Sequence, residues 1–208
     1  FYEGEVHGLM GENGAGKSTL MKVISGVIEA DKGCFYIGDE KFEKITPHQA
    51  SDKGLRIIHQ ELNLIPTLSV TENIFMGRFL GNGITVKFSE MRSRAQELFD
   101  EMGVTVNPDA LVEDLTVAQM QLVEIAKAVS QEVKVLIMDE PTSPLTQNEV
   151  ELLFKLIRRL KKKGVTIIYI SHRLSEIFEL TDRITVMRDG EKVITEETKN
   201  LDREKLIN

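Results

Sequence analysis

The sequence predicts an α/β fold in which a mainly parallel sheet is flanked by helices. Three observations support this fold class. A glycine-rich loop at 11–16 lies between an apolar run and a helical pattern, short apolar runs alternate with helical patterns along most of the chain, and 135–138 is continuously apolar. Such alternation is typical of parallel sheets, whose buried strands are apolar throughout. With 208 residues, of which 41% are hydrophobic, the chain can bury a sizeable core in one domain, with or without a subdomain.

The individual elements are predicted from hydrophobic periodicity and from local start and stop signals. Strands are expected at 6–10, 34–37, 41–45, 55–59, 133–138, 165–170, 183–188 and 192–195. Helices are expected at 16–25, 47–53, 70–75, 89–102, 117–130, 147–163 and 175–180, with another starting at 201. Thr46 is an expected N-cap, Ser69 and Glu72 match a capping box, and Asp189-Gly190 predicts a hairpin turn.

Two parts of the chain differ in pattern. The strands fall in 1–60 and 118–208, which we expect to form the core around the sheet. The stretch 61–117 has helical patterns without a core strand and is therefore a candidate helical subdomain. The run at 41–45 is expected to pair near the run at 34–37, within a truncated antiparallel β edge.

The glycine-rich loop matches a P-loop, the pattern in which backbone N–H groups surround a phosphate. Its glycines allow the tight curl, Lys17 supplies a mobile positive charge to the β- and γ-phosphates, and the Ser18 hydroxyl is a ligand for Mg²⁺. The helix that follows adds the positive end of its dipole. The residues expected to bind phosphate are Gly11, Glu12, Asn13, Gly14, Ala15, Gly16, Lys17, Ser18 and Thr19.

A second group of candidate residues follows other strands. Asp139 and Glu140 end the apolar run at 135–138, His172 follows the strand at 165–170, and Gln60 follows the strand at 55–59. Ligands of open α/β sheets bind at the carboxyl ends of the strands. Asp139 can hold Mg²⁺, and Glu140 can orient and polarise an attacking water.

Charge and composition narrow the class of protein. The formal net charge is −7, which argues against a nucleic-acid partner. A basic run at 158–163 stands at a helix end before Gly164, where cations complement the helix dipole. The single cysteine, Cys34, permits no intramolecular disulfide, and we interpret it as a packing residue.

The order of these motifs resembles the nucleotide-binding domain of ATP-binding cassette (ABC) transporters. The stretches 60–66, 68–74, 123–128 and 138–143 are similar to the sugar-importer branch, in which ribose, galactose or xylose import is driven by one polypeptide with two tandem cassettes. The resemblance covers the whole chain and implies the first cassette. It also implies that the second cassette, the first antiparallel strands and an upstream aromatic residue that stacks on adenine lie outside this chain.

The resemblance implies a role for each matching position. Gln60 would contact the Mg²⁺ and water site, Asp139 would hold the metal with Ser18, Glu140 would be the catalytic carboxylate and His172 would contact the γ-phosphate. Hydrolysis would then require ATP and Mg²⁺ between two cassettes placed face to face. The signature motif, which meets the ATP of the partner cassette, would be formed by Leu115, Thr116, Val117, Ala118 and Gln119.

Departures from the family pattern bear on these roles. Val117 and Ala118 replace the usual signature glycines, although Thr116 keeps a hydroxyl at a helix N-terminus. Pro144 stands in the D-loop, where a small residue is usual. In the family, the helical subdomain forms the groove for a transmembrane subunit, so the run Ile74-Phe75-Met76 is either part of that groove or simply core.

The function implied is ATP binding and hydrolysis that energises sugar import at the cytoplasmic face of a bacterial inner membrane. The implied partners are transmembrane permease subunits and, indirectly, a periplasmic sugar-binding protein. An alternative is a soluble ABC-type ATPase that acts as a nucleotide-driven clamp without transport. A further hypothesis is that this chain by itself has no ATPase activity and binds nucleotide at most.

Overall fold

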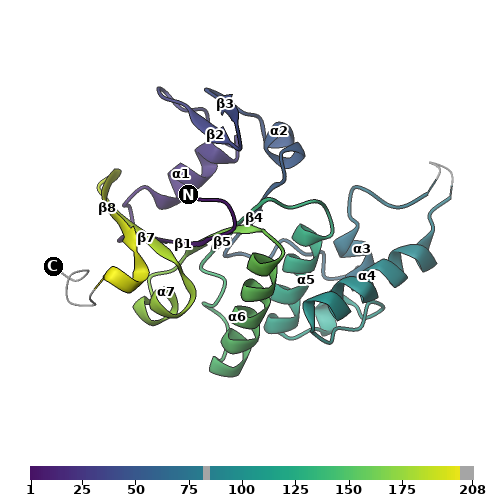
Figure 1. Cartoon of the computed structure of the whole chain (residues 1–208). Helices are drawn as coiled ribbons and strands as arrows, with labels where there is room; N and C mark the ends of the chain where they lie inside the picture. Colours follow the sequence, from purple (N-terminus) through teal and green to yellow (C-terminus); the bar gives the residue numbers. More distant parts are fainter. Residues whose placement is uncertain (82–84, 202–208) are drawn as a thin grey trace. The chain divides into compact units, whose positions relative to one another are not determined.

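The computed structural model describes residues 1–81 and 85–201. Its order of elements confirms the predicted α/β fold (Figure 1). The strands are β1 (Val6–Met10), β2 (Phe35–Ile37), β3 (Glu40–Phe42), β4 (Leu55–Ile58), β5 (Val135–Asp139), β6 (Thr166–Ile170), β7 (Arg183–Arg188) and β8 (Glu191–Glu197). The helices are α1 (Lys17–Ile24), α2 (Pro47–Asp52), α3 (Val70–Ile74), α4 (Phe88–Met102), α5 (Val117–Val129), α6 (Gln147–Lys162) and α7 (Leu174–Leu180). Two short 3₁₀ helices that the sequence analysis does not predict lie at Val112–Asp114 and Thr198–Asn200.

The described residues divide into two compact units. Unit 1 comprises Phe1–Ile57, Val133–Glu140 and the chain from Leu160 onward, and unit 2 comprises Ile58–Glu132 and Pro141–Arg159. The predicted helical stretch 61–117 lies inside unit 2, which also contains α5 and most of α6. The helix predicted from Leu201 onward falls outside the described residues except for Leu201 itself, which is not helical.

Unit 1 is built around a six-stranded sheet with the order β4-β5-β6-β1-β7-β8. The pairs β5–β6, β6–β1 and β1–β7 are parallel, whereas β7 and β8 form an antiparallel hairpin. Strands β2 and β3 pair antiparallel, as predicted, and form a two-stranded sheet of their own. The hairpin turn at Asp189-Gly190 is also confirmed, because both residues have positive φ, 51° and 82°, as a tight two-residue turn requires.

Both faces of this sheet are covered by side chains of unit 1. Figure 1 shows the sheet with α1 and α7 labelled beside it. On one face, Leu9, Ile168 and Ile170 pack with Met21 of α1 in a single buried cluster. On the other face, α7 lies against β1 so closely that a Cβ on Gly8 would be 3.1–3.2 Å from side-chain atoms of α7 and the residue after it. Because both faces are covered, the central strands are apolar at successive positions.

Unit 2 is a helical unit in which α3 packs against α4 and α5. The predicted capping box of Ser69 and Glu72 is confirmed, and Thr116 and Gln119 form a second reciprocal capping box at the predicted start of α5. Ile74 and Phe75 are buried, 0% and 4% exposed, so for these two residues the core interpretation is supported. None of the described helices is both long enough and apolar enough to cross a membrane.

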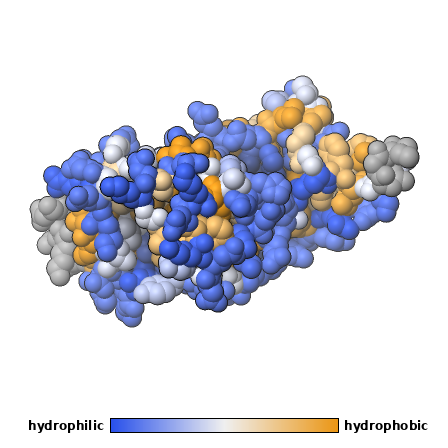
Figure 2. Space-filling view, turned by 90° about the horizontal axis from the view of Figure 1, so that it is seen from above, coloured by the Kyte–Doolittle hydropathy of each residue, from blue (hydrophilic) through white to orange (hydrophobic). Residues whose placement is uncertain are grey.

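Some apolar side chains of unit 2 remain on its surface. Phe79, Val86 and Phe88 are 44%, 40% and 53% exposed and flank residues 82–84. Figure 2 shows hydrophobic surface beside the grey atoms at the right of the view, which belong to this part of the chain.

One prediction about unit 1 is wrong. Cys34 is exposed rather than packed, because β2 begins only at Phe35.

Candidate functional site

The glycine-rich loop connects β1 to α1, both of which are anchored in the core of unit 1. Gly16 is the N-cap of α1 with φ +93°, a left-handed conformation that places Lys17 at the first helical position. The Ala15 amide donates to the Glu12 carbonyl at 3.1 Å, which closes the loop into a tight turn. The loop therefore has the curled backbone and the helix N-terminus that bind phosphate groups.

The turn between β7 and β8 supports this loop from one side. The Gly190 amide donates to the Ala15 carbonyl at 3.2 Å, and a Cβ on Gly16 would lie 3.2 Å from the Gly190 Cα. At the start of the loop, a Cβ on Gly11 would be only 2.4 Å from the Met187 carbonyl oxygen. The backbone of Met187 thus approaches Gly11 so closely that a side chain at this position has no room.

We expect Gly11→Ala to destabilise the protein much more than Gly14→Ala. Both glycines have positive φ, 155° and 88°, but a Cβ on Gly14 would meet nothing within 4 Å. Left-handed strain alone costs about 1–2 kcal/mol, and the backbone overlap at Gly11 adds about 1–3 kcal/mol. Urea unfolding of both variants measures the difference, and equal losses in free energy of unfolding would contradict the close approach.

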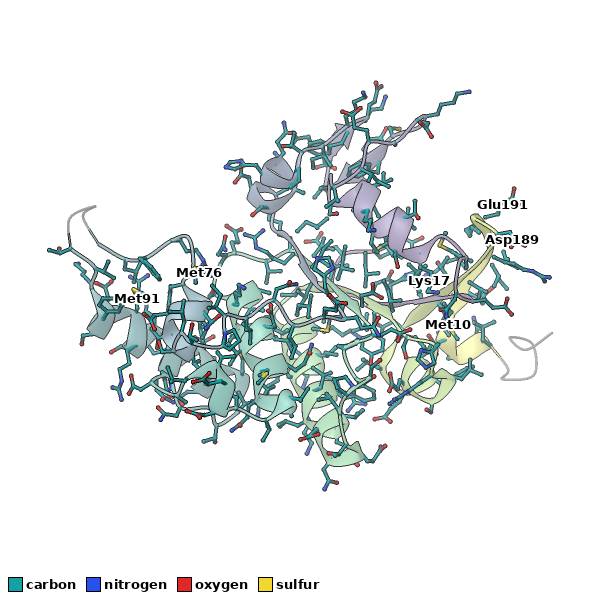
Figure 3. The ribbon with its side chains drawn as sticks, turned by 180° about the vertical axis from the view of Figure 1, so that it is seen from behind. Met10, Lys17, Met76, Met91, Asp189 and Glu191 are labelled. Atoms are coloured by element: carbon teal, nitrogen blue, oxygen red, sulfur yellow. The ribbon has the colours of Figure 1, made fainter. Side chains whose placement is uncertain are left out.

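The Lys17 side chain lies over the loop that precedes it. Its Nζ donates to the carbonyl oxygens of Gly11 and Glu12 at 2.7 and 3.0 Å. Figure 3 shows Lys17 near Met10 at the end of β1, with Asp189 at the neighbouring hairpin turn. The ammonium is thus held at the loop by two carbonyls, which a phosphate oxygen can replace as acceptors.

The predicted carboxylates stand at the end of β5, which pairs with β6 up to Asp139 and Ile170. Glu140 follows with φ +47°, an uncommon conformation for a residue other than glycine. Its amide donates to the Ile170 carbonyl at 2.9 Å, which holds the backbone in this conformation. Strained backbone of this kind clusters at functional sites, where surrounding structure maintains it.

Glu140 and His172 are brought together from the ends of neighbouring strands. Glu140 Oε1 and His172 Nδ1 are 2.8 Å apart, so an imidazole with its proton on Nδ1 donates to this carboxylate. The Glu140 side chain is 20% exposed and that of His172 62%, so the pair is open to solvent on the His172 side. A water-accessible carboxylate oriented by a histidine is suited to polarising water.

The turn that carries His172 is fixed by Glu176 of α7, which is 5% exposed. Glu176 Oε2 accepts from the Tyr169 hydroxyl and from the Ser171 hydroxyl, both at 2.9 Å. The Ser171 hydroxyl oxygen in turn accepts from the Arg173 amide at 3.0 Å. This buried network on both sides of His172 is not apparent in the sequence, although its members are only seven residues apart.

The predicted site residues fall into both units. The P-loop, Asp139, Glu140 and His172 belong to unit 1, whereas Gln60 and the stretch 115–119 belong to unit 2. Gln60 is exposed and lies two residues after β4. The stretch 115–119 opens α5, where Thr116 Oγ1 accepts from the Gln119 amide at 3.2 Å.

Candidate metal ligands in unit 1 are few. Across the described part of the chain, no three His, Cys, Asp or Glu side chains are grouped so that they could hold a metal ion. Mg²⁺ is commonly bound by one or two protein oxygens together with substrate phosphates and waters. The exposed Ser18 hydroxyl and the half-buried Asp139 carboxylate fit that donor set.

A buried polar group that the sequence analysis does not single out lies in β1. His7 is 2% exposed, and its Nδ1 is 2.7 Å from Glu5 Oε1, while its Nε2 is 2.7 Å from Thr185 Oγ1. Thr185 Oγ1 continues to Thr195 Oγ1 at 2.8 Å, so the chain of hydrogen bonds joins β1 to β7 and β8. Burial lowers the pKa of His7 below its ordinary 6.5, and the hydrogen bond that Glu5 accepts from His7 opposes this shift.

This lowered pKa predicts a pH-dependent stability. His7 binds a proton more readily in the unfolded chain than in the folded chain. Its contribution to the free energy of unfolding is therefore complete above about pH 6.5 and is lost as the pH falls through the folded-state pKa. Urea unfolding between pH 7.5 and 5 should show a steeper fall in unfolding free energy for the wild type than for His7→Gln. Equal slopes would contradict the lowered pKa.

Comparison with known proteins agrees with this geometry. The family model described as "ABC transporter" matches residues 1–143. A protein of Agrobacterium fabrum, provisionally named as a ribose/galactose/methyl galactoside import ATP-binding protein, is 54% identical over 93% of this chain and 38% of its own length. Ribose import ATP-binding protein RbsA 1 of Burkholderia cenocepacia is 48% identical over 99% of this chain and 41% of its own length. The chain thus spans about two fifths of the curated relatives it matches.

Solved structures of ABC transporter cassettes also resemble this chain. An ATP-binding cassette of an ABC transporter in its ADP conformation matches with a TM-score of 0.83 at 27% identity, covering 99% of this chain and 87% of the other. A dimeric cassette in a post-hydrolysis state, bound to ADP and Pi, matches with a TM-score of 0.81 at 25% identity, covering 96% and 88%. With the family model matching more than half of its length, this chain belongs to the ABC transporter family.

Proposed function

We propose that this chain is an ATP-binding and ATP-hydrolysing cassette that energises sugar import. The observation that carries the proposal is the arrangement of unit 1. A P-loop with Lys17 follows β1, and the hydrogen-bonded pair Glu140–His172 follows β5 and β6, of which β6 lies next to β1 in the sheet. This arrangement supports phosphate binding and water activation at the carboxyl ends of the strands of one sheet, where α/β proteins bind ligands.

For ATP binding, the loop from Gly11 to Thr19 supplies backbone N–H groups and the N-terminus of α1. Lys17 would exchange its two carbonyl acceptors for oxygens of the β- and γ-phosphates, which form stronger, charge-assisted hydrogen bonds. Ser18 and Asp139 would hold Mg²⁺, and the family resemblance implies Gln60 as a further ligand. The bound Mg²⁺ would neutralise charge on the phosphates.

For hydrolysis, Glu140 would orient and polarise the attacking water, and His172 would contact the γ-phosphate. The short Glu140–His172 distance supports this division of roles, because one imidazole can orient the carboxylate through Nδ1 while Nε2 remains available. Little covalent work is required of the protein in phosphoryl transfer, so positioning and charge neutralisation carry the catalysis.

The remaining roles depend on other chains. The stretch 115–119 would meet ATP bound to a second cassette, in the same polypeptide or in another copy. The dimeric cassette among the structural neighbours supports this arrangement. The names of the relatives support transmembrane permease subunits as partners at the cytoplasmic face of a bacterial inner membrane, with a periplasmic sugar-binding protein upstream. These names favour the importer over a soluble clamp.

The dependence of ATPase activity on protein concentration tests the interfacial site. If each ATP lies between two cassettes, phosphate release at saturating Mg-ATP should rise with the square of the protein concentration while most chains are monomeric. A strictly linear dependence would contradict the two-cassette site. Absence of turnover at every concentration would contradict hydrolysis by this chain alone.

Sugar import is tested in cells. Deleting the coding sequence should abolish growth on ribose or galactose as sole carbon source, and the wild-type gene should restore it. The gene carrying Lys17→Ala should fail to restore growth at equal protein level. Unimpaired growth of the deletion strain on each of these sugars would contradict the proposed import function.

A further inference from the structure

The backbone at Asn63 is held from both sides by side chains of α5. Its amide donates to Glu124 Oε1 at 2.8 Å, and its carbonyl accepts from Lys127 Nζ at 3.0 Å. Glu124 and Lys127 are three positions apart, so they lie on one face of the helix. Glu124 is only 9% exposed, and a carboxylate is costly to bury unless it is hydrogen-bonded. We call these two contacts the α5 latch.

A second side chain fixes the segment just after the latch. Asn73 of α3 is 1% exposed, and its Oδ1 accepts from the Ile65 amide at 2.7 Å. Its Nδ2 donates to the carbonyls of Ile65 and Ser69 at 3.0 Å. The segment 63–69 is therefore tied to α5 at its start and to α3 along its length, which leaves it little freedom within unit 2.

The latch connects two of the predicted functional regions of unit 2. Gln60 is three residues before Asn63, a span of at most about 11 Å of extended chain. At the other end, α5 begins at Val117 with a capping box that fixes Thr116 and Gln119. An α-helix of 13 residues is a rigid rod of about 20 Å, so a displacement at Glu124 also displaces the start of α5.

We propose that Glu124 and Lys127 are positioning residues that make the Gln60 segment and helix α5 move together. This inference rests on the proposed function, in which Gln60 responds to the nucleotide of its own cassette and 115–119 faces the nucleotide of the other. Through the latch, nucleotide binding at one ATP site then changes the position of residues 115–119, which face the second ATP site. Neither side chain is placed at the nucleotide.

The latch is distinguished from a merely structural contact by its effect on the response to ATP. Hydrogen exchange is measured on the whole chain with and without Mg-ATP, at the amides of Asn63, Gln119 and Met120. The variants are Glu124→Ala and Lys127→Met, which remove one contact each. Glu124→Gln keeps the acceptor oxygen but not the charge, and Glu97→Ala is a matched control at an exposed position of α4.

We expect Glu124→Ala to accelerate exchange at the Asn63 amide about tenfold or more, because a hydrogen bond to a charged group is lost. Mg-ATP should change exchange at Gln119 and Met120 in the wild type, in Glu124→Gln and in Glu97→Ala. That change should be lost in Glu124→Ala and Lys127→Met, while the Kd for Mg-ATP stays within about twofold of the wild-type value.

Two results would overturn the inference while leaving the proposed function intact. One is P-loop protection by Mg-ATP with no wild-type response at Gln119 and Met120. The other is a response in Glu124→Ala and Lys127→Met that equals that of the wild type, even if both variants are less stable. Absence of P-loop protection in the wild type would instead contradict the proposed function, and the inference would be lost with it.

Discussion

Replacing Lys17 with alanine is expected to weaken Mg-ATP binding by about 100-fold or more. The Lys17 ammonium is held at the P-loop by the carbonyls of Gly11 and Glu12, so the wild-type charge already lies at the proposed phosphate site. Each charge-assisted hydrogen bond contributes about 1.5–3 kcal/mol, and Lys17 can supply two to the β- and γ-phosphates. Calorimetric titration of the chain with Mg-ATP measures the change.

The matched control is Lys22→Ala, which removes an exposed lysine from the last turn of the same helix. Its Kd should remain within about twofold of the wild-type value, because the charge stands at the opposite end of α1. Equal affinity of Lys17→Ala and the wild type would place the nucleotide elsewhere and would contradict the P-loop assignment. Thermal unfolding of both variants without nucleotide shows whether the fold is retained.

Local signals account for the part of the fold that could be predicted. Thr46, Ser69 and Thr116 each accept from a backbone amide three residues on, and each starts a helix where the sequence analysis expects one. The strands end within one or two residues of the predicted positions in most cases, since apolar runs are bounded by turn residues. These features depend on neighbours within a few positions of the chain.

The parts that were missed depend on contacts between distant residues. Asn63 and Glu124 are 61 positions apart, and His7 and Thr185 are 178 apart, so no periodic pattern links them. The left-handed backbone of Glu140 has the same origin, because the Ile170 carbonyl holds its amide from a neighbouring strand. A carboxylate after an apolar run predicts a site residue, but neither its strain nor its histidine partner can be derived from local sequence.

The division of candidate site residues between two units is a related finding. The order of motifs along the chain predicts which residues act in one reaction, but it does not predict that Gln60 belongs to the helical unit rather than to the sheet unit. Ile58, the last residue of β4, already belongs to unit 2. The boundary therefore falls within β4, and Gln60 is the third residue on the unit 2 side.

Replacing Glu140 with glutamine is expected to reduce ATP turnover by about 100- to 10,000-fold, the range for loss of a general base. Glutamine has nearly the same shape and can keep a hydrogen bond to His172 Nδ1 through its amide oxygen. The substitution therefore removes the basic oxygen and leaves the packing largely unchanged. Mg-ATP affinity should change by no more than about threefold, because the proposed role of Glu140 is to act on water rather than on the phosphate groups.

Steady-state phosphate release, measured at a protein concentration where the wild type is active, checks this prediction. Glu151→Gln in α6 is the matched control, because it removes an exposed carboxylate from a helix and should leave turnover unchanged. A large loss of affinity in Glu140→Gln would show that the carboxylate shapes the nucleotide site. Retained turnover would assign water activation to another group and leave the strained backbone at φ +47° without a catalytic explanation.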